Sequence, residues 1–434
     1  MAESTALREL ADRVLAKGRA HGFDDFEVTA RENGLSEMQI DAGQVSLLRS
    51  TNEVTLSLRA FSAGRMASVE LNQVDSESLA LSMQQLSEGV QATPVDEARV
   101  LVGPQSVQRL EYGPVEPSLE QMHERITSFA KVTVTEYPDI KMEQSGLQFL
   151  RNEMVRLNTK GLSISSGTGS YSFFGMFSGK RNGRTSSFNY SGGHVSSLDR
   201  ELIDIAAVRR LMASSVREID HKPLEGKFVG PAILSPECFM DLANSWLSHL
   251  RDGTMIAGTS RLRDKLGQKV ASPLLHLSVR PADALFAARE LYTSEGYVAA
   301  PSSILESGVL KSFMLSDYGA RRTGLERSPN GGGNLVFERG LSSVNEMIDE
   351  TKHGLFLQRF SGGYPAANGD FSGVAKNSYL IVDGELAQPL SEVMVSGNLF
   401  DLMNDVVSVS HEAVNDGTTE VPFVRVAKLT VTGK

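Results

Sequence analysis

Short segments bounded by turn residues follow one another between residues 26 and 71. They span residues 26–30, 36–41, 45–50, 54–61 and 66–71. The dipeptides Asn33-Gly34, Ala42-Gly43 and Ala63-Gly64 lie between them, where hairpin turns would join strands. This arrangement predicts an antiparallel sheet close to the N-terminus.

Three amphipathic helices are expected in the sequence: one before this sheet, one directly after it and one further along the chain. Ser4, Asp75 or Ser76, and Ser118 are suitable N-caps, and Gly22 is a stop signal for the first helix. Apolar residues follow each cap at helical spacing. They are Leu7, Leu10, Ala11, Val14 and Leu15 in the first helix, Leu79, Met83, Leu86 and Val90 in the second, and Leu119, Met122, Ile126 and Phe129 in the third.

The middle of the chain connects this region to a second one. Residues 92–117 contain four prolines without periodicity and predict an extended connection, whereas residues 140–190 are rich in Gly and Ser and predict further hairpins. Residues 202–212 predict a helix. We place a domain boundary near Glu225, which gives an N-terminal α+β domain of residues 1–225 and a mainly β domain of residues 226–434.

The second region begins with an apolar strand over residues 228–234. Ser235 as N-cap and Pro236 at the first helical position then predict a helix that reaches Leu250. Its inward positions are Phe239, Leu242, Ala243, Trp246 and Leu250. Strands are expected at residues 310–315, 378–382 and 423–431, so the fold class is α+β with two domains.

Composition and charge limit the partners and the cellular compartment to be expected. The 434 residues carry a formal net charge of -10, so direct binding to nucleic acid is not expected. No stretch is long and apolar enough to cross a bilayer, and residues 1–9 lack the order of a secretory signal, which predicts a cytoplasmic protein without membrane contact. The single cysteine, Cys238, fits a reducing compartment.

The histidines do not form a metal motif. Zinc proteases of the helical type need two histidines on one helical face. No two of the eight histidines lie within six residues of each other, and no histidine follows His123-Glu124 or His411-Glu412 within the next turn or two of a helix. We therefore predict no metal site and no catalytic residue in this chain. A site assembled from distant residues remains an alternative.

Two other features are candidates for a chemical role, Cys238 and a run of three glycines. Cys238 lies near the start of the predicted helix, where the helix dipole lowers a thiol pKa, so it is a candidate nucleophile, although a buried structural cysteine is the favoured interpretation. The run Gly331-Gly332-Gly333 lacks the Lys-Ser/Thr of a phosphate-binding loop and predicts a flexible loop.

Motifs near the C-terminus carry a resemblance to a known family. They are Gly369-Asp370-Phe371-Ser372-Gly373-Val374-Ala375, Ile381-Val382-Asp383-Gly384-Glu385, Pro389 and Ser396-Gly397-Asn398-Leu399. In order and spacing they resemble the TldD/TldE (PmbA) family, peptidase U62, and its TldE/PmbA-type subunit in particular. The chain departs from the family pattern at Lys376-Asn377-Ser378 and in a shortened loop after Gly331.

The resemblance implies a role in a complex. It implies a non-catalytic subunit of a TldD/TldE heterodimeric metalloprotease that acts on unfolded or precursor peptides. Zinc is expected in the TldD-like partner, on a helix with an HExxxH motif equivalent to residues 236–250 here, and no cofactor is expected in this chain. The resemblance leaves a homodimer of the isolated chain open as an alternative to the heterodimer. The family's older label is modulator of DNA gyrase.

Glycine-rich segments are the candidates for peptide binding, because unencumbered backbone groups can pair with an extended chain. The candidate residues are Gly331, Gly332, Gly333, Ser361, Gly362, Gly363, Gly369, Asp370, Phe371 and Ser372. Two alternatives stay open. In the first, the chain is a self-sufficient hydrolase that uses Cys238 or a dispersed metal site. In the second, it is a non-proteolytic modulator that binds gyrase.

Overall fold

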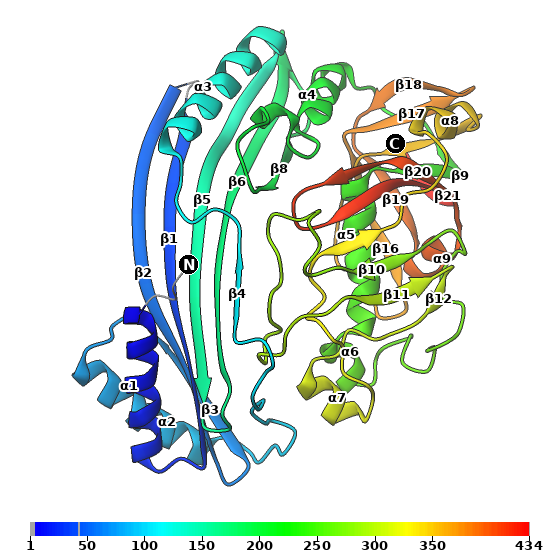
Figure 1. The fold of residues 1–434 in the computed structure, drawn as a ribbon. Coiled ribbons are helices and arrows are strands. Elements are labelled where there is room, and N and C mark those ends of the chain that lie inside the picture. The colour runs from blue at the N-terminus through cyan, green and yellow to red at the C-terminus, as the bar shows by residue number, and fades with distance from the viewer. Residues whose placement is uncertain (1–4, 42–43, 434) are drawn as a thin grey trace.

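Two β-sheets lie side by side in the protein, one from each half of the chain (Figure 1). The computed structural model describes residues 5–41 and 44–433. Helices cover the first sheet on one face, and the second sheet is folded around a central helix (Figure 1). The predicted α+β class is confirmed.

The first sheet is built from unusually long strands. Its order is β3-β2-β1-β5-β6, and β4, β7 and β8 each pair with a different part of β6. Among the described strands of this sheet, only β4 runs parallel to its neighbour, and it lies within the stretch predicted to be an extended connection. The strands are β1 (Asp25–Asp41), β2 (Gln44–Ser62), β3 (Arg65–Leu71), β4 (Arg109–Tyr112), β5 (Ile140–Asn158), β6 (Ser163–Arg181), β7 (Arg184–Thr185) and β8 (Asn189–Val195).

The three predicted turns have different outcomes. Ala63-Gly64 is a turn, with φ of 49° and 72°, and it joins β2 to β3 at the pair Ser62 and Arg65. Asn33-Gly34 is not a turn: β1 continues through it, and the two residues pair with Glu53 and Asn52. Pairing on both sides of β1 keeps this dipeptide extended. Ala42-Gly43 lies outside the described residues.

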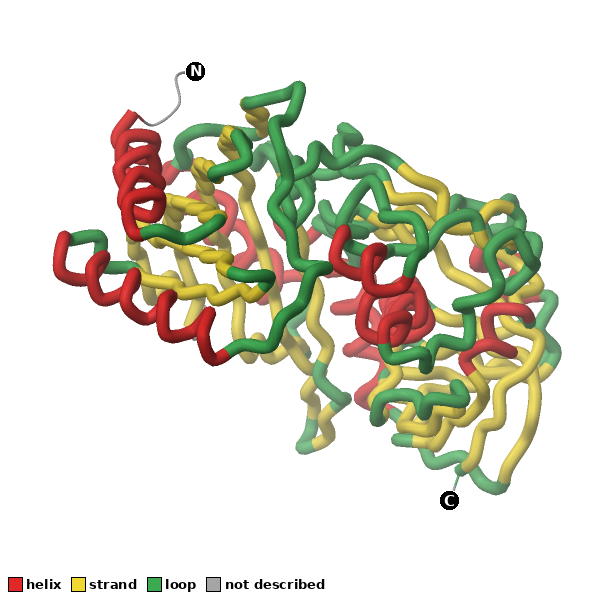
Figure 2. The backbone as a smooth tube through the Cα atoms, turned by 90° about the horizontal axis from the view of Figure 1, so that it is seen from below, coloured by secondary structure: helices red, strands yellow, loops and turns green. Residues whose placement is uncertain are grey.

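Four helices pack on one face of the first sheet. They are α1 (Thr5–His21), α2 (Ser76–Ala92), α3 (Leu119–Glu136) and α4 (Val208–Arg217). Even-numbered side chains of β1 meet these helices: Val28 and Ala30 lie in the cluster with α1 and α2, and Met38 and Ile40 lie in the cluster with α3 and α4. Figure 2 shows the first two of these helices outside the strands, away from the C-terminal half.

The helix predictions are largely confirmed. Asp75 and Ser118 cap α2 and α3, and the predicted inward residues are buried except Leu119, which is 43% exposed. Ser4 lies outside the described residues. The helix predicted over residues 202–212 is wrong in extent. A 3-10 turn, η1 (Leu202–Asp204), precedes α4, because Ala206 has a φ of 48° and interrupts the helical backbone.

The second sheet contains the larger hydrophobic core. Its main path is β12-β11-β10-β13-β21-β9-β14-β17-β18, and β15, β16, β19 and β20 branch from it through β21. The strands are β9 (Lys227–Leu234), β10 (Leu277–Val279), β11 (Ser302–Glu306), β12 (Val309–Leu310), β13 (Leu335–Phe337), β14 (His353–Leu357), β15 (Arg359–Gly362), β16 (Asp370–Lys376), β17 (Ser378–Val382), β18 (Glu385–Leu390), β19 (Val393–Asn398), β20 (Val406–Asn415) and β21 (Glu420–Thr432).

The strands expected at residues 378–382 and 423–431 are confirmed as β17 and part of β21. The strand expected at residues 310–315 is wrong, because the chain leaves the sheet after Leu310. Four short helices lie between strands of this sheet in the sequence: α6 (Asp252–Ile256), α7 (Asp317–Thr323), α8 (Val344–Asp349) and α9 (Leu399–Asn404).

The central helix is α5 (Pro236–Leu247), followed by the 3-10 turn η3 (Ser248–Leu250). The Ser235 hydroxyl accepts a hydrogen bond from the amide of Cys238, as an N-cap does. The predicted inward stripe is fully or almost fully buried: Phe239, Leu242, Ala243, Trp246 and Leu250. Phe239 packs edge-on against Phe337 of β13. The prediction for this helix is therefore confirmed.

The boundary near Glu225 falls between the two sheets, in the segment before β9. The division into domains of residues 1–225 and 226–434 stays a prediction. Among the described helices, none is long and apolar enough to cross a membrane.

Candidate functional site

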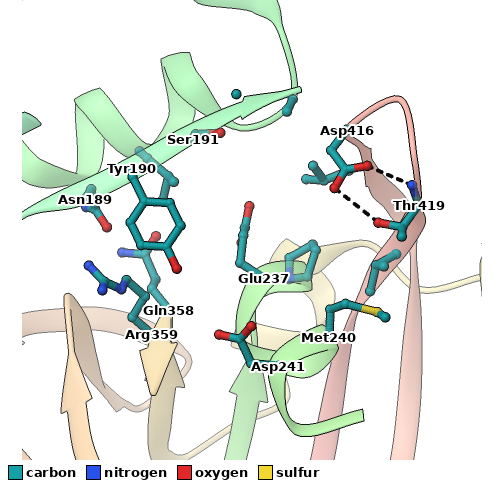
Figure 3. A pocket seen from close by; sticks show the side chains of 16 residues that line it. Asn189, Tyr190, Ser191, Glu237, Met240, Asp241, Gln358, Arg359, Asp416 and Thr419 are labelled. Atoms are coloured by element: carbon teal, nitrogen blue, oxygen red, sulfur yellow. Dashed lines mark hydrogen bonds between the residues drawn. The ribbon is translucent and has the colours of Figure 1, made fainter. Parts of the chain in front are cut away.

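A cavity of about 230 Å³ lies where the two sheets meet (Figure 3). The first sheet contributes β8, and the second contributes the start of α5, the start of β15 and the turn between β20 and β21. Its lining consists of Asn189, Tyr190, Ser191, Gly192, Ala206, Leu211, Pro236, Glu237, Met240, Asp241, Gln358, Arg359, Val414, Asp416, Thr419 and Val421.

The outer face of α5 contributes two acidic side chains to the cavity. Glu237, Met240 and Asp241 are spaced i, i+3 and i+4, so they share one helical face and point into the cavity (Figure 3). The stripe that contains Phe239 and Trp246 faces the core instead. One helix therefore serves both packing and the cavity.

Arginines compensate these carboxylates. One Nη of Arg210 donates to Glu237 Oε1 at 2.6 Å, and Glu237 Oε2 is buried without a hydrogen-bond partner among the described residues. Burial raises the pKa of Asp241, nearby Arg359 opposes this, and Glu237 adds to it. Of the three acids in the lining, Glu237 and Asp241 are thus each associated with a guanidinium group, and the third is Asp416.

Arg359 is fixed by aromatic side chains. Its guanidinium lies 4.5 Å from the ring centre of Phe188 and 4.7 Å from that of Tyr190, and it donates to the Phe188 carbonyl at 2.6 Å. Tyr190 is 55% exposed, and its ring extends from β8 toward the side of the cavity that α5 and Gln358 form (Figure 3). A planar cation and an exposed ring are suited to contact a polar peptide chain.

The turn between β20 and β21 closes the cavity from the other side. Asp416 holds this turn through bonds from the amides of Thr418 and Thr419, and its own carbonyl accepts from the amide of His194 at 2.7 Å. A Cβ atom on Gly193 would lie 2.4 Å from that carbonyl. Only glycine allows the two backbones to approach this closely.

Behind the cavity, a buried polar network joins the two halves of the chain. Gln358 Nε2 donates to Ser214 Oγ and to Glu218 Oε1 at 2.8 Å, and Gln358 Oε1 accepts from Arg210 at 3.1 Å. The Tyr379 hydroxyl also donates to Glu218 Oε1. Burial raises the pKa of Glu218 to about 7, although its hydrogen bonds from Ser214, Tyr379 and Gln358 act in the opposite direction.

This pKa predicts a dependence of stability on pH. The folded protein keeps the Glu218 proton up to about pH 7, whereas the unfolded chain loses it above its usual pKa of 4.5. The folded state binds more protons in this window, so the free energy of unfolding should fall by about 3 kcal/mol as pH rises through it. Glu218→Gln should remove this slope in denaturant titrations at a series of pH values. Glu225→Gln, at an exposed carboxylate, should keep the slope, and an unchanged slope in Glu218→Gln would contradict the assignment.

The structure separates the predicted peptide-binding residues into two groups. The first is the loop of Gly331, Gly332 and Gly333, whose amides are already used. The Glu290 carboxylate accepts from Gly331 at 2.6 Å and from Gly333 at 3.2 Å, and Asn330 Oδ1 accepts from Gly332 at 3.1 Å. Because these three amides already donate hydrogen bonds within the chain, they are not available to a bound peptide.

The second group lies on the hairpin of β15 and β16. Ser361 and Gly362 belong to β15, Gly363 follows it, and Gly369 precedes Asp370, Phe371 and Ser372 of β16. Phe371 is buried, whereas Ser361 and Gly362 are exposed. Among the described strands, β15 pairs only with β16, so its other edge is open. Arg359 at its start joins this edge to the cavity.

Several cavity residues were not predicted from sequence. Glu237 and Asp241 have the helical spacing that could have indicated them, since they flank the predicted inward stripe of α5. Tyr190, Gln358, Arg359 and Asp416 come from separate segments and have no local signature.

The donors of this cavity do not fit the zinc site that the resemblance places on the equivalent helix of a TldD-like subunit. They are Glu237 of α5, which is paired with Arg210, Asp241 of α5, and Asp416, which accepts from the amides of its own turn; none of the described lining residues is a histidine. Across the described ranges, no three His, Cys, Asp or Glu side chains are grouped as metal ligands.

Comparison with known proteins decides the family. Residues 226–433 match the model of the PmbA/TldA metallopeptidase C-terminal domain. A metalloprotease of Methanothermobacter thermautotrophicus is 31% identical over 219 residues, which are 48% of this chain and 46% of that protein. The metalloprotease PmbA of Escherichia coli O157:H7 is 26% identical over 208 residues, which are 47% of this chain and 46% of that protein. Residues 226–433 therefore carry the C-terminal domain of the TldD/TldE (PmbA) family.

The recognition from the C-terminal motifs is therefore confirmed, and the family is metallopeptidase-like. The chain spans about half the length of these two relatives. TldE from Thermococcus kodakarensis has the same fold, with a TM-score of 0.85 at 18% identity over 98% of this chain and 100% of that one. A protein from Bacteroides thetaiotaomicron described as a modulator of DNA gyrase has a TM-score of 0.83 at 21% identity over 99% and 100% of the two chains.

Proposed function

We propose that this chain is the non-catalytic, TldE-like subunit of a heterodimeric metalloprotease that acts on unfolded or precursor peptides. The observation that carries the proposal is that both faces of α5 are occupied by residues other than zinc ligands. Its inner face is core, and its outer face presents Glu237 and Asp241, which are associated with Arg210 and Arg359. A helix used in this way serves packing and charge compensation. Zinc then belongs to the TldD-like partner.

One open sheet edge supports a role in holding peptide. Among the described strands, β15 pairs only with β16, and Arg359 at its start lines the cavity, whereas the outer edge of β8 is met by the β20–β21 turn through the bond from His194 to Asp416. An unpaired edge offers backbone donors and acceptors to an extended peptide without regard to its sequence. Such binding suits a substrate class defined by being unfolded. The residues proposed for this contact are Ser361, Gly362 and Gly363, together with Arg359.

Complex formation tests the proposal. The chain and a TldD-like subunit from the same cell are expected to co-elute in gel filtration after co-expression, and the mixture is expected to cleave an unfolded peptide faster than the TldD-like subunit alone. Separate elution together with an unchanged cleavage rate would contradict the proposal. Zinc analysis of each peak shows which chain carries the metal.

Cys238 provides a second test, directed at the alternative of a self-sufficient hydrolase. The thiol is fully buried, and burial, with Asp241 and Glu237 adding to it, raises its pKa well above the usual value. Cys238→Ala is therefore expected to leave peptide cleavage by the reconstituted complex within about twofold of wild type, because a buried neutral thiol is a poor nucleophile. A loss of cleavage in a variant that still folds and co-elutes would favour the hydrolase instead.

A further inference from the structure

A second cavity, of about 280 Å³, lies on the helix-free face of the first sheet. The sheet contributes Thr29 and Arg31 of β1, Asn152, Met154 and Arg156 of β5, and Ser166 and Thr168 of β6. The segment of residues 289–294, from the C-terminal half, covers it. Odd-numbered residues of β1 face it, whereas the helices cover the even-numbered side, so this cavity belongs to neither hydrophobic core of the first sheet.

The lining carries more positive than negative charge. It contains three guanidinium groups, Arg31, Arg156 and Arg289, and one carboxylate, Glu290. Glu290 is held by the amides of Gly331 and Gly333, so its oxygens are engaged away from the arginines. Hydroxyl and amide groups of the remaining lining residues add neutral hydrogen-bond donors around them.

Two of these arginines form no ion pair with a carboxylate of the described residues. Arg31 lines the cavity with an exposed side chain and makes no hydrogen bond or ion pair with any described residue, although Glu70 and Glu27 lie near enough to affect its charge. Arg289 donates only to the carbonyls of Phe286 and Ala282, and its guanidinium lies 3.4 Å from the ring centre of Tyr112. Desolvation and the neighbouring Arg156 lower the pKa of Arg31 and outweigh the opposing effect of Glu70 and Glu27, so an added anion would stabilise this guanidinium.

Arg156 gives an independent indication of a missing ligand. It is almost completely buried, with Nη2 donating to Glu27 at 2.8 Å and Nη1 donating to the Ser294 carbonyl at 2.6 Å. Its Nε is buried without any partner in the described structure. Buried donors normally have an acceptor, so an unpaired one in the wall of a cavity indicates a bound group. Glu27 cannot supply it, since that carboxylate also binds Arg59 and Asn158.

We propose that this cavity binds a carboxylate of the peptide substrate, with Arg31 as the main contact and Arg156 and Ser166 beside it. The proposal rests on the proposed function, because it assigns to a peptide-holding subunit the chemical group that it recognises. Guanidinium and carboxylate groups match in geometry and form charge-assisted hydrogen bonds. The carboxylate comes either from the free C-terminus or from an acidic side chain, and both sources present the same group.

Direct binding to the purified full-length chain tests the proposal. The probe is a short fluorescein-labelled glycine–serine peptide in three forms: with a free C-terminal carboxylate, with an amidated C-terminus, and amidated with one internal glutamate. Wild type should bind at least one carboxylate form about 10-fold more tightly than the neutral form, in line with one charged hydrogen-bonded pair. The form that is preferred identifies the source of the carboxylate.

Arg31→Gln should abolish this preference, while affinity for the neutral form stays within about twofold, because only the charged contact is lost. Arg13→Gln is the matched control, since Arg13 is an exposed arginine on α1, on the opposite face of the sheet. Equal binding of all three peptides by wild type, no binding of any of them, or a preference retained in Arg31→Gln would overturn the proposal. Thermal unfolding of both variants checks that they are folded.

Co-elution with the TldD-like subunit distinguishes this proposal from the proposed function. A chain that forms the active complex but has no carboxylate preference contradicts only the carboxylate site. A chain that shows the Arg31-dependent preference but forms no complex contradicts only the proposed function.

Discussion

Trp246→Ala is expected to lower the free energy of unfolding by about 3–5 kcal/mol, the range for removing a large aromatic side chain from a packed core. Trp246 is fully buried on the inner face of α5, in the cluster that also contains Phe239 and Phe337. The cavity left by the indole would be lined by side chains that cannot close it completely. Urea unfolding, followed by far-ultraviolet circular dichroism, measures the change.

Trp246→Phe is the matched control. The indole Nε1 is buried without a hydrogen-bond partner in the described structure. Phenylalanine removes this unpaired donor and keeps an aromatic ring, so the loss of stability should be less than half that of alanine. Equal losses for the two substitutions, or no loss for alanine, would contradict the packing described for α5.

Gln358→Leu is expected to lower the free energy of unfolding by about 3 kcal/mol. One or two buried polar groups lose their hydrogen-bond partner, and each loss costs about 1–3 kcal/mol. Gln358 is 2% exposed and bonds to Ser214 and Glu218 from the first half of the chain and to the Asn377 carbonyl from the second. Leucine has similar size but can replace none of these bonds. Denaturant unfolding monitored at two wavelengths measures both the stability and the cooperativity.

The substitution should also loosen the contact between the two sheets, so limited proteolysis near residues 218–226 should accelerate. Gln85→Leu is the matched control, since Gln85 is exposed on α2 and its change should stay within about 0.5 kcal/mol of wild type. If both glutamine variants unfold at the same denaturant concentration as wild type, the network does not join the sheets.

Local signals account for the parts of the fold that could be predicted. The Ser235-Pro236 start and the apolar stripe of α5 act within one helix, so the sequence is sufficient to predict them. The Asn33-Gly34 dipeptide is the contrary case. Its local preference is for a turn, but β2 and β5 pair with β1 on both sides, and these long-range hydrogen bonds keep it extended.

The candidate site was less predictable because it is assembled from distant segments. Glu218, Gln358 and Tyr379 meet only after the two sheets have come together, and none has a distinctive sequence neighbourhood. The triglycine loop illustrates the same limit. Its composition suggested free backbone amides, but Glu290, 41 residues earlier, occupies those of Gly331 and Gly333.

The central claim is that this chain contributes no catalytic zinc and acts only with a TldD-like partner. Its most direct test is the cleavage rate of an unfolded peptide measured for the purified chain alone, the TldD-like subunit alone and the reconstituted pair, with zinc present throughout. We expect no cleavage by the chain alone and the highest rate for the pair. Zinc-dependent cleavage by the chain alone, at a rate equal to that of the pair, would contradict the claim.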